Sequence, residues 1–230
     1  MFTRTFTWRP PVVTTSGDVT VEATSPNGAV ATFNSSAVDA GGGSTDVTCV
    51  PQSGSTFPLG TTTVNCSSTD RYNNTGSRSF SVKVVDTTKP TLTLPANITT
   101  SATSFAGAAV AFTASALDLV DGVRPIVCSP ASGSTFAIGA TTVSCTSVDT
   151  RGNSAARTFT VTVTFNFAQA RTLLLTLISA ARTGNTAAAC SQLAGVIPVI
   201  QAQVGSRLTQ AEATVLIRLA TDARRSLGCP

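Results

Sequence analysis

The chain falls into two segments with different hydrophobic periods. Up to about Thr164, apolar and polar residues alternate over short stretches separated by Gly and Pro, as in residues 79–84 and 158–163. A period of two places one face of a strand on a core and the other face in water. Beyond Val163, apolar residues recur at helical spacing instead. The pattern therefore predicts a mainly β protein with a helical C-terminal unit.

An internal repeat organises the β segment. The stretch CVPQSGSTFPLGTTTVNCSSTD at 49–70 recurs as CSPASGSTFAIGATTVSCTSVD at 128–149, an offset of 79 residues without a gap. Several short strands separated by turn residues are typical of a β-sandwich. The sequence thus predicts two tandem β-sandwiches at 1–85 and 86–164, each ending in a hairpin whose polar turn lies at 70–74 or 149–153.

The chain contains six cysteines, four in the β segment and two in the helical unit. Their number is even, no C-x-x-C pair occurs, and the chain has no His to complete a zinc site, so disulfides are favoured over metal ligands. The repeat requires the same pairing in both copies, and pairing of neighbours is the simplest solution. The expected bonds, which imply an oxidising compartment, are Cys49–Cys66, Cys128–Cys145 and Cys190–Cys229.

The unit at 165–230 is expected to hold three helices. The first ends near Gly184 and Asn185, the second runs over about 187–204 with a kink at Pro198, and the third begins with the capping box Thr209–Glu212. The whole net charge of +4 lies in this unit, as an excess of Arg over acidic residues. No aromatic residues interleave these arginines, which favours a solvated helix face over a nucleic-acid site.

The composition leaves little room for catalysis. Without His there is no Ser-His or Cys-His relay, and two Glu and two Lys offer few acid, base or amine groups. We therefore predict that the protein is not an enzyme and has no cofactor. Oxygen ligands for calcium occur close together in sequence, although Asx turns explain them better and no metal is predicted; the candidates are Asp118, Asp121, Asp149 and Asn153.

The termini and apolar runs bear on location. Residues 1–11 contain Arg4, Trp8 and Arg9 and lack the apolar stretch of a secretion signal. This suggests either that a signal was removed or that the chain leaves the cell as part of a virion released by lysis. The most apolar run, 173–181, is shorter than the roughly 20 residues that cross a bilayer, so no transmembrane segment is predicted.

The repeated pattern resembles the hyalin-repeat domain, an immunoglobulin-like module of extracellular proteins. The resemblance rests on C-x-P-x-S-G-S-T-F-x-x-G-x-T-T-V-x-C-x-S-x-D-x-x-x-N followed by F-x-V-x-V, and on D-x-x-x-P and P-A-N-I at the start of the second copy. The first copy replaces that start with Trp8-Arg-Pro-Pro. The resemblance implies adhesion or spacing in surface proteins without enzymatic activity. The helical unit resembles small C-terminal modules of secreted bacterial multidomain proteins.

These observations predict a non-catalytic structural or adhesion protein, outside the cell or on the surface of a particle. The sandwiches would act as a spacer, and the helical unit would dock or assemble. Protein partners or copies of the chain itself are expected, with a cell wall, a capsid or a glycan as alternatives and no nucleic acid. A virion decoration or fibre protein is the first alternative function. A glycan-binding module is the second, and the single Trp and single Tyr argue against it.

Overall fold

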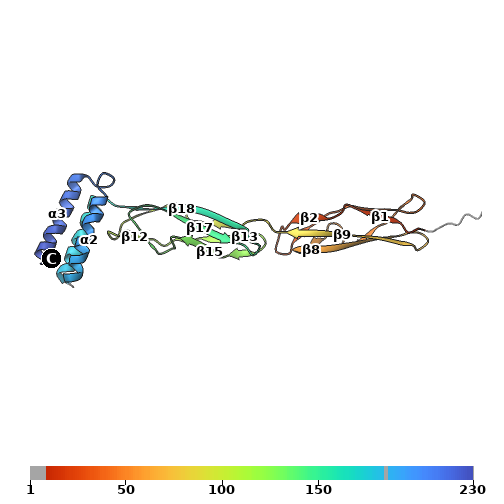
Figure 1. Ribbon diagram of the computed structural model, residues 1–230, viewed down its shortest axis with the longest axis horizontal. Helices are drawn as coiled ribbons and strands as arrows, with labels where there is room; N and C mark the ends of the chain where they lie inside the picture. Colours follow the sequence, from red (N-terminus) through yellow and green to blue (C-terminus); the bar gives the residue numbers. More distant parts are fainter. Residues whose placement is uncertain (1–8, 184–185, 230) are drawn as a thin grey trace, which may run out of the picture. The chain divides into compact units, whose positions relative to one another are not determined.

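The structure, a computed structural model, describes residues 9–183 and 186–229. Strands occupy the chain up to residue 164 and three helices follow, as the hydrophobic periods predicted (Figure 1). The strands of the first copy are β1 (Val12–Thr15), β2 (Val19–Glu22), β3 (Ala29–Val30), β4 (Ser35–Val38), β5 (Ser44–Thr45), β6 (Thr48–Val50), β7 (Thr56–Phe57), β8 (Gly60–Thr69) and β9 (Thr75–Val85). The start of the first copy at Trp8 lies outside the described residues.

The second copy repeats this order of strands. They are β10 (Thr91–Thr93), β11 (Ile98–Ser101), β12 (Ala108–Ala109), β13 (Ser115–Asp118), β14 (Gly122–Arg124), β15 (Ile126–Ser129), β16 (Thr135–Phe136), β17 (Gly139–Val148) and β18 (Ser154–Thr164). The four-stranded sheets are β2-β9-β8-β6 and β11-β18-β17-β15, and the three-stranded sheets are β1-β4-β5 and β10-β13-β14. Each copy therefore has the two sheets of a β-sandwich.

The alternating pattern places the core in each sandwich. Along β9, Phe80, Val82 and Val84 are buried, and Phe159, Val161 and Val163 are buried at the same positions of β18. The hairpin predicted from the polar turn is present, because β8 pairs antiparallel with β9 from Gly60↔Val84 to Thr69↔Thr75. The alternation of the sequence thus fixes which face of each long strand is buried.

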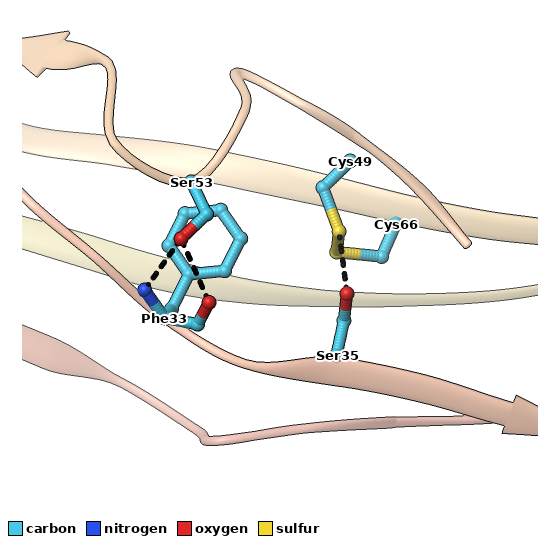
Figure 2. The surroundings of a disulfide bond; sticks show 5 residues. All are labelled: Phe33, Ser35, Cys49, Ser53 and Cys66. Atoms are coloured by element: carbon cyan, nitrogen blue, oxygen red, sulfur yellow. Dashed lines mark hydrogen bonds between the residues drawn. A yellow bond between two sulfur atoms is a disulfide. The ribbon is translucent and has the colours of Figure 1, made fainter. Parts of the chain in front are cut away.

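The SGSTF loop is held by one serine in both copies. In the first, the Ser53 hydroxyl accepts from the backbone N–H of Phe33 and donates to its carbonyl, both at 2.8 Å (Figure 2). Ser132 bonds Phe112 in the same way, at 2.8 and 2.7 Å. Phe57, at the end of the loop, is fully buried. The loop therefore has a structural role.

Three disulfides occur, in the pairs that the sequence predicted: Cys49–Cys66, Cys128–Cys145 and Cys190–Cys229. In the first sandwich, Cys49 and Cys66 face each other in the register of β6 and β8, and the Ser35 hydroxyl oxygen lies 3.5 Å from the Cys49 sulfur (Figure 2). Both half-cystines are buried in the core. The bond therefore joins an edge strand to the centre of its own sheet.

The C-terminal unit contains α1 (Phe167–Thr183), α2 (Thr186–Ala202) and α3 (Gln210–Ser226). The predicted capping box is present, since the Thr209 hydroxyl accepts from the Glu212 backbone and the Glu212 carboxylate accepts from the Thr209 backbone. Pro198 lies inside α2. Residues 184 and 185, predicted to end the first helix, lie outside the described residues. Buried apolar side chains at helical spacing form the core of the unit: Leu174, Ile178, Leu193, Ile200, Leu216 and Ala220.

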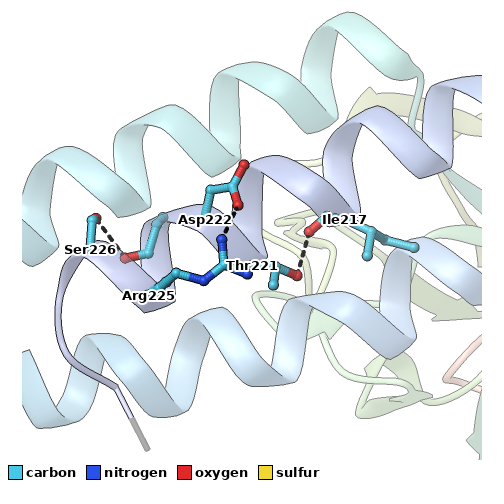
Figure 3. A network of polar contacts seen from close by, with 6 residues as sticks. Ile217, Thr221, Asp222, Arg225 and Ser226 are labelled. Carbon is cyan, nitrogen blue, oxygen red and sulfur yellow. Dashed lines mark hydrogen bonds and ion pairs between the residues drawn. The ribbon is translucent and has the colours of Figure 1, made fainter.

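The last helix exposes its polar side chains to solvent. Arg225 Nη1 lies 3.1 Å from Asp222 Oδ1, and both side chains are largely exposed (Figure 3). The Thr221 hydroxyl donates to the carbonyl of Ile217 at 2.8 Å. Such exposed pairs add little to stability. The charge on this face is therefore available to solvent or to a partner.

The C-terminal unit contacts the adjoining sandwich through α1 and the segments that flank the helices. Arg207 Nη1 donates to the Val163 carbonyl at 3.3 Å, and Gln169 donates to the Ser101 hydroxyl at 2.8 Å. Phe165, which is buried, packs edge-on against Phe105 with ring centroids 5.9 Å apart. The second sandwich and the helical unit thus share buried surface.

Candidate functional site

The described carboxylates with a shifted pKa are all shifted downward. They are Asp18, Asp70, Asp121, Asp149 and Glu212. Hydrogen bonds donated to the ionised carboxylates lower these pKa values, because such bonds favour the charged form. A general acid at neutral pH needs the opposite shift. These groups are suited to organise turns or hold a cation, and not to donate protons.

Two of these carboxylates organise the hairpin turns. Asp70 Oδ1 accepts from the Asn74 backbone at 3.0 Å, and Asn74 Nδ2 donates to Asp70 Oδ2 at 2.9 Å. Asp149 and Asn153 make the same bonds at 2.8 and 2.6 Å. Burial raises the pKa of Asp149, but the hydrogen bonds from Asn153, Arg151 and Gly152 together outweigh burial, and the net pKa is lowered. Both are the Asx turns that the sequence favoured.

Three carboxylates converge at one end of the second sandwich. One carboxylate oxygen each from Asp86, Asp121 and Asp149 lies within 4.8 Å of the other two. Asp86 precedes β10, Asp121 lies between β13 and β14, and Asp149 follows β17. Hydrogen bonds from Thr150 lower the pKa of Asp121, while the charge of Asp149 raises it. The carboxylates are therefore close enough to repel one another.

The four calcium candidates from the sequence are only partly brought together. Asp121 and Asp149 belong to the cluster, and Asp118 lies beside it, with its Oδ1 accepting from the Asp121 backbone at 2.9 Å. Asn153 donates its amide to Asp149 and to the Asp86 carbonyl. Asp86 was not predicted, because hydrophobic periodicity does not mark a residue between two sandwiches. Its place at the start of the second copy was the only available signal.

An apolar pair faces outward on the second sandwich. Leu117 on β13 and Val123 on β14 are cross-strand partners, exposed to 59% and 81%. At the same positions of the first copy, Val38 pairs with Ser44. Cross-strand apolar pairs normally lie on a covered face. On its other side Val38 pairs with Val12, exposed to 45% and 70%, so each copy carries one exposed apolar pair on this sheet, on a different pair of strands.

A groove of about 630 Å³ lies where the loop at 103–106 meets α1 and α2. Its lining is mainly apolar and includes Phe105, Leu173, Leu177 and Val196. None of its lining residues is titratable. The groove therefore offers shape and apolar contact, without acid or base chemistry.

Among the described residues, no helix is long and apolar enough to cross a membrane.

Comparison with known proteins identifies a family and a relative. A family profile for the HYR domain matches residues 8–84 and again residues 85–163. The chain is 36% identical over 167 residues to hyalin of Strongylocentrotus purpuratus, a match that covers 67% of this chain and 14% of that protein. Because the chain spans only this small share of hyalin, the activity of the whole relative does not transfer to it.

Solved structures of low sequence identity to this chain are also similar to it. They include titin domains Z1Z2 in complex with telethonin (13% identity, TM-score 0.36, covering 67% of this chain and 98% of that one). Human protocadherin-24 EC1-2 is another (16% identity, TM-score 0.30, covering 66% and 97%). The HYR matches and the disulfides fit an extracellular adhesion-type module and point to a non-enzymatic protein. The profile covers well over half of the sequence, and the chain belongs to the HYR-domain family, with two HYR domains in tandem.

Proposed function

We propose that this protein is a non-catalytic spacer and protein-interaction module that works outside the cell. In this proposal the chain has three parts, two sandwiches at 1–85 and 86–164 and a helical unit at 165–230. The two sandwiches act as a spacer, and exposed faces of the second sandwich and of the helices bind a partner protein. The arginine excess lies in the helical unit alone and would attract an acidic surface of a partner protein.

The observation that carries the proposal is the exposed pair Leu117 and Val123. Two large apolar side chains side by side on a sheet are unfavourably exposed to water, and covering them is favourable. The face is also self-complementary, since a twofold rotation places the same pair of one copy over that of another. A second copy of the chain is therefore the partner to test first.

Bonds at the start of the second copy support the spacer role. Thr87 donates from its backbone N–H and its hydroxyl to Glu22, at 2.6 and 3.0 Å. The Ala23 backbone donates to the Val85 carbonyl at 2.7 Å. The short segment that ends at Pro90 is thereby tied to strand β2, and a tied segment can maintain distance better than a free linker.

The test compares self-association of the oxidised full chain with that of a variant carrying Leu117→Thr and Val123→Ser. Sedimentation equilibrium is expected to show a dimer for the wild type and a monomer for the variant. Val38→Ser in the first copy is the matched control, since it removes an exposed valine from the equivalent strand and should leave the dimer intact.

The outcomes discriminate among the alternatives. A wild-type monomer at high micromolar concentration would refute self-association through this face. Defined fibres or particles in electron microscopy would favour a virion fibre or decoration protein. Hits on a glycan array that survive both surface variants would favour a glycan-binding module instead.

A further inference from the structure

We propose that Asp86, Asp121 and Asp149 bind a calcium ion at the start of the second HYR domain. All three belong to the same compact unit of the fold, and one oxygen of each lies within 4.8 Å of the others. The three residues lie on loops that are far apart in sequence, between β9 and β10, between β13 and β14, and between β17 and β18. The proposal does not depend on the protein-contact surface described above.

One carboxylate oxygen of this cluster is buried and unsatisfied. Asp86 is only 6% exposed, and its Oδ1 accepts from the Thr88 backbone and hydroxyl at 3.2 and 2.8 Å. Its Oδ2 is buried and has no hydrogen-bond partner. A buried carboxylate oxygen without a partner is costly unless it is hydrogen-bonded or coordinates a metal. A cation among the three carboxylates would satisfy it.

Asp118 repeats this condition beside the cluster. It is 2% exposed, and its Oδ1 accepts from the backbone N–H groups of Val120 and Asp121, at 2.8 and 2.9 Å. Its Oδ2 is also buried without a partner. These bonds hold the turn that carries Asp121. A fourth carboxylate so near the other three increases the need for a positive charge.

Positive charge from the protein is scarce at this point. Arg124 lies on β14, directly after the turn that carries Asp121. The Arg124 side chain donates from Nε to the Val148 carbonyl at 3.4 Å. One guanidinium cannot balance several carboxylates, two of which, Asp86 and Asp149, are largely buried. A divalent ion would remove most of the repulsion.

The donor set selects calcium. All the donors are carboxylate oxygens, and the chain has no His and no free thiol among the described residues. Such hard oxygen donors suit calcium or magnesium and not zinc or copper. Calcium accepts irregular sets of 6–8 oxygens completed by water, whereas magnesium demands an octahedron and loses its water reluctantly. Carboxylates from three separate connections match the calcium requirement better.

The first copy provides an internal comparison. At an offset of 79 residues, Asp149 corresponds to Asp70, but Asp121 corresponds to Gly42 and Asp86 to Thr7. The Asx turn at Asp70 is nevertheless the same as that at Asp149. The turn therefore needs only one carboxylate, and the fold does not require the other two. The extra acidic residues of the second copy are explained by a ligand.

The test titrates calcium chloride into the oxidised full chain after chelation, by isothermal titration calorimetry near neutral pH. One site is expected per chain, with Kd of about 0.1–1 mM, the range of extracellular calcium modules. Asp86→Asn and Asp149→Asn should each weaken binding by about tenfold or more, because each removes one anionic ligand. Asp70→Asn, which alters the same turn in the first copy, should leave Kd within about twofold.

A second measurement separates a ligand from a structural residue. In EDTA, Asp86→Asn should melt at the wild-type temperature or above it, because one of three repelling charges is gone. In calcium the order should reverse, with the wild type gaining stability and the variant gaining little. Magnesium at the same concentration should have a smaller effect. No heat and no melting shift in about 10 mM calcium, or equal losses for Asp70→Asn and Asp149→Asn, would overturn the proposal.

Discussion

Removing the Cys190–Cys229 disulfide gives a quantitative test of how the helical unit is stabilised. The bond joins the second turn of α2 to the residues after α3, with a sequence separation of 39 and a Cα–Cα distance of 5.4 Å. Closing a loop of that length in the unfolded chain is worth about 4 kcal/mol in the chain-entropy model. Both cysteines are half-buried, so replacing them with alanine leaves little cavity. Loop closure should therefore account for most of the loss.

That loss is large for a unit of this size. A domain of about 60 residues is stable by about 3–9 kcal/mol, so losing about 4 kcal/mol removes much of its stability. For so small a unit, each kcal/mol lowers the melting temperature by about 4–8 °C, which predicts a fall of at least about 15 °C. The Cys190→Ala/Cys229→Ala variant is expected to lose its helical circular dichroism in an early, separate transition.

The control is the Cys49→Ala/Cys66→Ala variant in the first sandwich. Its sequence separation of 17 corresponds to about 3 kcal/mol, a loss that should lower the β transition and leave the helical one unchanged. A helical transition that moves by less than about 5 °C in the Cys190 and Cys229 variant would refute the reasoning. It would show that contacts with the second sandwich, and not the disulfide, supply the stability of the unit.

Three further changes test the fold. Gly107→Ala should destabilise the second sandwich by about 3 kcal/mol or more in urea unfolding, because a Cβ there would overlap the Phe136 carbonyl; Gly133→Ala, which meets nothing within 4 Å, should cost only about 1–2 kcal/mol of backbone strain. Thr209→Ala should cost the helical unit about 1 kcal/mol by removing its N-cap, while Thr221→Ala, in the middle of α3 and exposed, should be nearly neutral by thermal melting. In calcium-free buffer, the melting temperature should fall as pH drops below about 4. Carboxylates whose folded pKa lies below the ordinary value stabilise the protein above that value and lose this contribution as they protonate. A melting temperature that stays level or rises from pH 4 to pH 2 would contradict this.

Local sequence patterns were sufficient to predict most of the fold. The alternation along β9 and β18 set the buried face, and the polar turn at Asp70 set the hairpin. The capping box at Thr209 marked the start of α3. Each signal depends on neighbouring residues only, and local geometry gives it a single outcome. The resemblance to hyalin repeats rested on the same local strings, which the family match confirmed.

The candidate calcium site could not be predicted from local patterns alone. Asp118, Asp121 and Asn153 looked like turn residues, and each does make turn contacts. Whether an acidic turn also meets another acidic residue depends on how separate connections pack at one end of a sandwich. No other acidic residue lies near Asp86 in the sequence, so residue spacing could not identify Asp86 as part of an acidic cluster.

The amino-acid sequence by itself determined the two copies, their strands and helices, the parity of the cysteines and the lack of imidazole chemistry. These properties depend on residue type and on short-range periodicity, which the chain carries before it folds. Only the tertiary structure decided that three carboxylates converge and that Leu117 and Val123 face outward as a pair. Proximity between distant residues follows from sheet packing and register, because these bring together segments whose separation along the chain holds no record of their final distance.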